Sequence, residues 1–149
     1  MELSELFAGR EEQIKAMQAR LHQLAIVEGF PLAERTRTCN SRRAQELGKW
    51  AEAQGKGDLF RKAVYRAYFV DGRNIAKVDE LVQIAEAVSL PGDEARAVLT
   101  RGSFAAAVDA DWQRAGELRI PAVPTHLCDG RRLTGFSSYD DFVRLIGKG

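Results

Sequence analysis

Residues 118–135 read LRIPAVPTHLCDGRRLTG, and this stretch decides how the chain closes. The runs 122–128 and 131–135, on either side of Asp129-Gly130, are typical of two short strands. Asp-Gly suits a turn that needs positive φ at both central positions. The Val123-Pro124 step stands at the start of the first strand, where a proline that cannot donate a ladder hydrogen bond favours a cis bond or a strand edge. The stretch therefore predicts a β-hairpin.

Upstream of this hairpin, apolar residues recur at three- and four-residue steps, the spacing of one face of a helix. Short polar side chains at Asn40 or Ser41, and at Asp58, can accept hydrogen bonds from the first N–H groups of a helix. After the hairpin, Ser138 and Asp141 fit a capping box ahead of a last helix. The expected elements are helices over 11–28, 40–55, 58–71, 78–88, 93–99 and 104–117, strands over 122–128 and 131–135, and a helix from 138.

This order predicts a mostly α protein with a C-terminal β-hairpin, in the α+β class. We expect a helical domain over residues 1–117 and a β-β-α segment over 118–149, together forming one compact unit. The aromatic residues between 60 and 69 repeat at helical spacing, which favours a place in the core over a cofactor stack. Trp112 is expected on the buried side of its helix.

Length and composition set the class of protein. A chain of 149 residues, 45% hydrophobic and 29% charged, is typical of one soluble globular domain. Its formal net charge of +1 argues against a broad nucleic-acid or membrane surface, because an excess of Lys and Arg recruits those partners. No apolar run approaches the ~18 residues that span a bilayer, and residues 1–5 lack the basic and apolar regions of a secretory signal. We therefore expect a cytoplasmic protein.

Cys39 and Cys128 lie far apart in the sequence and form neither a C-x-x-C pair nor a metal knuckle. With two His and no Cys/His cluster, we expect no metal site. Two unpaired thiols in a reducing compartment are the expected state.

The hairpin stretch resembles the closing half of a thioredoxin fold. In the DsbA-like group, a helix ends in a Leu-Gly-Ile-like turn, followed by Gly-Val-Pro-Thr, an apolar strand and Asp-Gly. Upstream, EGF at 28–30, TCNS at 38–41 and RAYFVDGRNI at 66–75 agree with the same group. From about residue 3 to 146 the chain is similar to FrnE-type thiol-disulfide oxidoreductases and to 2-hydroxychromene-2-carboxylate isomerases, which are related to kappa-class glutathione transferases.

The resemblance implies a role for Val123 and Pro124. In the proteins that this chain resembles, the proline is cis and lies beside the active-site cysteines. The backbone of the preceding residue there pairs with an extended substrate, a form of β-augmentation. Val123 would then offer its N–H and C=O, and Pro124 would hold them in place. The alternative is that Pro124 only terminates the connection from the sixth helix.

A complete domain of that group opens with strand, C-x-x-C or a Ser-containing equivalent, helix and second strand, and the sequence begins after all of these. A two-stranded hairpin is marginal alone, and its open edge is a template for another strand. Three explanations for the open edge are a homodimer, a second polypeptide that completes the sheet, and an experimental fragment. We favour the homodimer.

Cys39 is a candidate nucleophile, because it precedes a predicted helix start whose free N–H groups stabilise a thiolate. A half-buried structural thiol is the alternative, and Cys39 stands where the group usually has Pro. Asn40 is a substrate-binding candidate through the resemblance. Arg37 and Arg42 could hold a small anion or a glutathione-like ligand at a helix N-terminus, or belong to a solvated charged loop. His126 is expected on the hairpin surface rather than as a general base.

The resemblance implies a DsbA/FrnE-like thiol-disulfide oxidoreductase that acts on a thiol or disulfide peptide, with its redox motif absent from these residues. One alternative is a glutathione-dependent isomerase acting on a small aromatic acid. A second is a non-enzymatic peptide-binding or assembly module. No cofactor is required, although glutathione is compatible with the isomerase reading, and neither nucleic acid nor a membrane is an expected partner.

Overall fold

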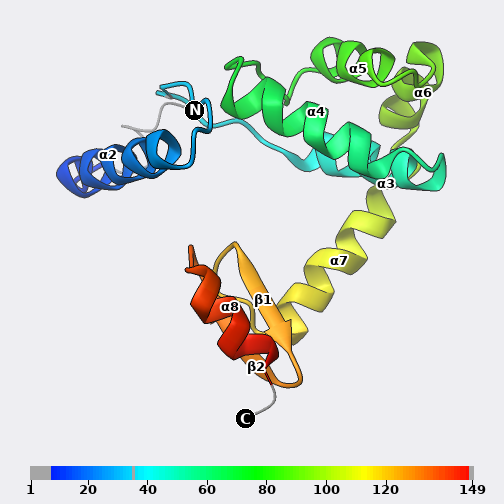
Figure 1. Cartoon of the computed structure of the whole chain (residues 1–149). Coiled ribbons are helices and arrows are strands. Elements are labelled where there is room, and N and C mark those ends of the chain that lie inside the picture. Colours follow the sequence, from blue (N-terminus) through cyan, green and yellow to red (C-terminus); the bar gives the residue numbers. More distant parts are fainter. Residues whose placement is uncertain (1–7, 35, 148–149) are drawn as a thin grey trace. The chain divides into compact units, whose positions relative to one another are not determined.

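The computed structural model describes residues 8–34 and 36–147 (Figure 1). Residues 1–5, on which the expectation about a secretory signal rests, lie outside these ranges. In the described part, six helices, a β-hairpin and a terminal helix follow one another, so the predicted order and fold class are confirmed. The elements are α2 (Glu11–Val27), α3 (Arg42–Ala53), α4 (Gly57–Phe69), α5 (Val78–Ala87), α6 (Gly92–Arg101), α7 (Ala105–Glu117), β1 (Thr125–Cys128), β2 (Arg131–Thr134) and α8 (Tyr139–Ile146).

The chain divides into two compact units, Met1–Val108 and Asp109–Gly149. The division falls inside α7, whereas the sequence placed the boundary after residue 117. Each unit is described by itself below. In the described ranges, no helix is long and apolar enough to cross a membrane.

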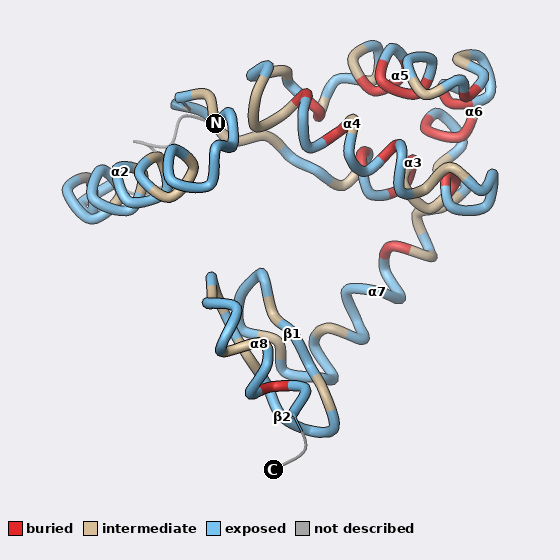
Figure 2. The backbone as a smooth tube through the Cα atoms, viewed as in Figure 1, coloured by how far each residue is buried: buried red, intermediate tan, exposed pale blue. Residues whose placement is uncertain are grey.

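The first unit has its hydrophobic core among α3, α4, α5 and α6, which pack on one another (Figure 2). Leu47, Phe60, Leu81 and Ile84 are the largest fully buried side chains in this core. Each of these helices contributes apolar residues three or four positions apart, as their sequence periodicity predicts. The apolar residues of α2 are less enclosed, since Met17 and Leu21 are about half exposed.

The expected place of the aromatic residues of α4 is only partly confirmed. Phe60 is buried and Tyr68 packs against the core, but Tyr65 is 57% exposed. Trp112 was expected on the buried side of its helix and is 51% exposed, so that expectation is wrong. Val108 is the last residue of the first unit and is buried, whereas Trp112 lies one turn later, beyond that core.

The structure shows which of the predicted residues cap the N-termini of α3 and α4. Between the two candidates at the start of α3, Asn40 accepts the hydrogen bond, with its Oδ1 2.9 Å from the Arg42 backbone nitrogen. Ser41 makes no capping bond with its side chain. Asp58 lies within the first turn of α4 rather than at its N-cap position, which is Lys56. Gly57 permits the close approach of α3, because a Cβ there would lie 2.5 Å from Cγ of Glu52.

In the second unit, Asp129 and Gly130 have φ of 47° and 77° and join β1 to β2 as predicted. The antiparallel register pairs Thr125 with Thr134 and Cys128 with Arg131. The first strand begins at Thr125, later than predicted, because residues 122–124 form an irregular loop. Helix α8 packs against both strands (Figure 1).

Leu47 and Leu59 provide a matched test of where the core lies. Leu47 is fully buried and Leu59 is 56% exposed. We expect Leu47→Ala to lower the free energy of unfolding by about 2–5 kcal/mol, since it leaves a cavity, and Leu59→Ala to lower it by less than about 1 kcal/mol. Urea denaturation followed by circular dichroism measures both values, and equal losses would contradict this core.

The capping box of α8 makes a second prediction. Ser138 Oγ accepts from the Asp141 backbone N–H at 3.3 Å, and Asp141 Oδ2 accepts from the Ser138 backbone N–H at 3.0 Å and from its hydroxyl at 2.7 Å. We expect Ser138→Ala to cost about 1 kcal/mol at pH 7 in urea denaturation. Ser41→Ala is the control, since the Ser41 hydroxyl makes no cap bond and accepts an exposed hydrogen bond from Gln45 Nε2 at 3.0 Å, and it should change stability by less than about 0.5 kcal/mol.

The same box has a pH signature. The pKa of Asp141 is lowered, mainly because its carboxylate accepts hydrogen bonds from the Ser138 hydroxyl and backbone N–H. Desolvation opposes this shift in part, and the positive charge of Arg144 adds to it. Because the pKa is lower in the folded state, the ionised carboxylate stabilises the protein at pH values above the ordinary Asp pKa of about 3.9. This stabilisation is lost as the pH falls through the pKa of the folded state. In Ser138→Ala, carbon-13 NMR should show the Asp141 pKa returning towards its ordinary value. An unchanged titration would argue against the box.

Candidate functional site

The loop before β1 presents an unpaired stretch of backbone. The Val123–Pro124 peptide bond is cis, and Val123 is 88% exposed. Among the described residues, neither its N–H nor its C=O takes part in a hydrogen bond. On either side the loop is fastened, since Pro124 O accepts from the Gly135 N–H at 2.8 Å and the Thr125 hydroxyl donates to Ala122 O at 2.6 Å.

The register extends this unpaired stretch along β1. Cys128 and Arg131 flank a two-residue turn, so they form a hydrogen-bonded pair, and such pairs alternate along the ladder. The bond between Gly135 and Pro124 continues this alternation. The backbone groups of Leu127 and Thr125 therefore point away from β2, in line with Val123. Within the described residues, the sheet has two strands only, and this outer edge of β1 has no partner.

The two faces of the hairpin have different neighbours. The His126 ring packs edge-to-face on Phe142 of α8 with centroids 4.7 Å apart, so α8 covers the face that carries His126 and Leu133. Arg131 shares this face and donates to Arg144 O at 3.3 Å and Gly147 O at 2.7 Å. His126 is thus exposed and engaged in packing.

On the opposite face, Arg132 binds the end of α7. Its Nη1 donates to Arg119 O at 2.9 Å and its Nη2 to Leu118 O at 2.6 Å. Sequence reasoning did not single out this arginine. The available signal was the Arg-Arg pair directly after Asp-Gly, since consecutive strand residues point to opposite faces.

The other predicted site residues belong to the first unit. Cys39 is half-buried and packs against the hydrophobic core, and it and Cys128 are both free thiols. Asn40 is exposed, and its side-chain oxygen caps α3. The structure thus brings Cys39, Asn40, Arg37 and Arg42 into one unit, while Val123 and Pro124 belong to the other. The role of Cys39 as a nucleophile stays a prediction.

Arg42 is committed to a structural ion pair. Its Nε donates to Oε1 of Glu46 at 3.0 Å, and its Nη2 donates to Ala105 O at 3.4 Å. Glu46 is the buried charged residue of α3, so Arg42 supplies the charge that this carboxylate needs. Arg37 is exposed, and an anion site at Arg37 and Arg42 stays a prediction.

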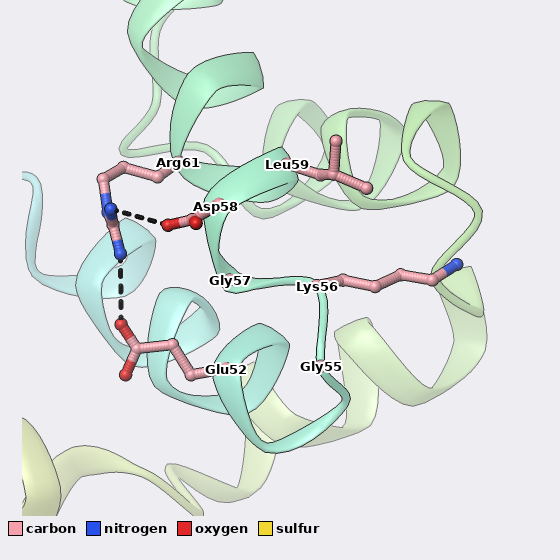
Figure 3. Close-up of a pocket in the computed structure, with 7 residues that line it drawn as sticks. All are labelled: Glu52, Gly55, Lys56, Gly57, Asp58, Leu59 and Arg61. Atoms are coloured by element: carbon pink, nitrogen blue, oxygen red, sulfur yellow. Dashed lines mark hydrogen bonds and ion pairs between the residues drawn. The ribbon is translucent and has the colours of Figure 1, made fainter.

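The corner between α3 and α4 forms a hollow whose charges are satisfied (Figure 3). Arg61 pairs with Asp58 at 2.9 Å and with Glu52 at 3.5 Å. Lys56 points away from this group and donates to Val88 O at 3.1 Å and Ser89 O at 2.7 Å. The hollow therefore offers no unsatisfied charge. Across the described ranges, no cluster of three or more His, Cys, Asp or Glu could hold a metal ion.

The hairpin flanked by α8 and the helical unit that precedes it agree with a DsbA-like protein of the thioredoxin fold. The chain belongs to the family of DSBA-like thioredoxin domains, which it matches over residues 2–147. No curated protein matches the chain.

Solved structures that are similar to the chain include the following two. One is the crystal structure of a probable DsbA oxidoreductase from Streptomyces coelicolor, with 28% identity, a TM-score of 0.84, and coverage of 95% of this chain and 64% of that one. The chain thus spans less than two thirds of the length of that protein. The other, a putative protein disulfide isomerase from Nitrosomonas europaea, is 17% identical with a TM-score of 0.68, covers 90% of this chain and 72% of that one, and shares the fold.

The Arg42–Glu46 pair gives a third prediction. We expect Arg42→Met to lower the free energy of unfolding by about 1–3 kcal/mol, because it leaves the Glu46 carboxylate buried without its partner. The double variant Arg42→Met/Glu46→Met should recover most of this loss. Arg43→Met is the control, since Arg43 is exposed, and should have little effect. A double variant less stable than Arg42→Met would contradict the pairing.

Proposed function

We propose that this chain provides the peptide-binding half of a FrnE-type thiol-disulfide oxidoreductase. The observation that carries this proposal is the unpaired backbone of the exposed residue Val123, continued by the outer edge of β1. An extended peptide lying antiparallel or parallel to this edge would form hydrogen bonds with Val123 first, then with Thr125 and Leu127. The alternate spacing of these residues matches the two-residue repeat of a strand.

The redox step needs a cysteine pair, which these 149 residues do not contain as a C-x-x-C motif. In the proposed reaction, a thiolate of that pair attacks the substrate disulfide, forming a mixed disulfide and releasing one substrate thiolate. The second thiolate then displaces the other substrate sulfur, so two electrons pass from the pair to the substrate. The reverse sequence oxidises a substrate dithiol. Our proposal therefore requires the pair to come from polypeptide outside these residues or from a partner chain.

An assembly module is the second candidate function. It is favoured by an exposed apolar stripe on α8, formed by Tyr139, Val143 and Ile146 at helical spacing, beside a two-stranded sheet with open edges. A homodimer or a second polypeptide that adds strands to β1 would cover both features. Sedimentation of the chain at micromolar concentration distinguishes the dimer from a monomer.

The glutathione-dependent isomerase has less support. It would use Asn40, Arg37 and Arg42, but the Asn40 oxygen caps α3 and the Arg42 guanidinium binds Glu46. Calorimetric titration with millimolar glutathione tests it, and measurable heat that Arg37→Ala abolishes would revive it. A cytoplasmic location stays a prediction.

Peptide binding is tested at Val123. The probe is a neutral, unstructured decapeptide rich in Thr and Val with one alkylated Cys, titrated into nitrogen-15-labelled protein. We expect amide shifts at Val123, Thr125 and Leu127. Val123→Pro removes the backbone donor and should weaken binding about 3–10-fold, the value of one hydrogen bond.

Val123→Ala keeps the backbone donor and is the matched control, expected to bind within about twofold of the original chain because the interaction uses main-chain groups. Thermal unfolding of both variants checks that the fold is retained. Shifts outside the loop and β1, or equal binding by Val123→Pro and the original chain, would overturn the peptide-binding proposal.

A further inference from the structure

Helix α7 ends in a way that depends on β2. The Arg119 N–H donates to Gly116 O at 2.9 Å and the Ile120 N–H donates to Ala115 O at 3.0 Å, which is the bonding pattern of a Schellman motif. Arg119 occupies the left-handed position of this motif with φ of 51°, where glycine is the usual residue. This helix end therefore places a residue with a side chain in a conformation that such residues rarely adopt.

Arg132 binds this helix end. Its guanidinium bridges the carbonyls of Leu118 and Arg119, at 2.6 and 2.9 Å, using two of its nitrogens. A planar guanidinium can reach two acceptors at once in a fixed geometry, which a lysine ammonium cannot reproduce. The end of α7 is thus tied to β2 at a defined distance.

The loop that carries Val123 is fastened to the β2 segment at both of its ends. Arg132 holds the carbonyls where the loop begins, and the Gly135 N–H, immediately after β2, holds Pro124 O where it ends. Residues 120–123 lie between these two attachments, and within this stretch the Ile120 N–H donates to Ala115 O and Ala122 O accepts from the Thr125 hydroxyl. The path of this stretch is set by where these attachments place the ends of the loop.

We infer that Arg132 is a positioning residue that sets the orientation of the Val123 backbone for a peptide partner. This inference rests on the proposed peptide-binding function. Arg132 acts through the Leu118 and Arg119 carbonyls and does not itself contact the peptide. When the bridge is broken, residues 120–123 gain freedom, and a peptide must order them before it can pair with Val123.

Arg131 is a matched control within the same strand. It is the same residue type, it is also exposed, and it also donates to carbonyls at the end of a helix, namely those of Arg144 and Gly147. It lies on the opposite face, and in the described part of the chain its hydrogen bonds go to the end of α8 and not to residues 118–124. A general loss of helix support should affect the Arg131 and Arg132 variants alike, whereas positioning should affect only the latter.

The experiment compares Arg132→Lys and Arg131→Lys in the full chain, with two readouts. The first is the affinity for the Thr/Val decapeptide, expected to fall about 3–10-fold in Arg132→Lys and less than about twofold in Arg131→Lys. The second needs no peptide: hydrogen exchange of the Gly135 amide and NMR order parameters of residues 120–123. In Arg132→Lys we expect faster Gly135 exchange and order parameters falling from about 0.85 towards 0.6.

The two readouts separate the inference from the function on which it rests. If the original chain does not bind the decapeptide, the proposed function fails, and the loop measurements alone decide the role of Arg132. Loop order and Gly135 exchange that are unchanged in Arg132→Lys would overturn the inference, with or without peptide binding. Equal losses of affinity in the two lysine variants would reduce Arg132 to a structural role and would also overturn it.

Discussion

The two-residue turn at Asp129 and Gly130 is the constraint on which the C-terminal unit depends. Positive φ at both positions matches the twist of the flanking strands, so the turn closes the hairpin in one register. That register assigns every strand side chain to a face. A slip of one residue would exchange the faces of Arg131 and Arg132, and neither arginine would then reach its helix end.

The two units differ in how completely they bury their apolar surface. The first closes a core among α3, α4, α5 and α6, with Leu47 and Phe60 excluded from water. In the described part of the second unit, Leu145 is buried, while Tyr139 and Ile146 on the same helix are exposed. A two-stranded sheet with one such helix leaves backbone edges and apolar side chains available for another polypeptide. The candidate site lies where this closure is incomplete.

Local signals explain which expectations were confirmed. The Ser138–Asp141 cap, the Asp-Gly turn and the helical repeats depend on residues close in the sequence, and the structure contains all three. Burial was harder to predict at Tyr65 and Trp112, because periodicity identifies which face of a helix is apolar but not whether another element lies opposite that face. Arg42 illustrates the same limit for charge, since its partner Glu46 and its carbonyl contact at Ala105 become evident only in the folded chain.

The sequence by itself determined the order of elements, the hairpin turn, the caps and the resemblance to the DsbA-like family, because each depends on neighbouring residues or on an ordered set of motifs. Only the tertiary structure decided that Arg132 holds the end of α7 and that the backbone of Val123 has no described partner. Hydrogen bonds between distant segments depend on strand register and on the distance between elements. Residue type alone specifies neither the register nor these distances. Arg131 and Arg132 are adjacent residues of the same type, and they bind the ends of different helices.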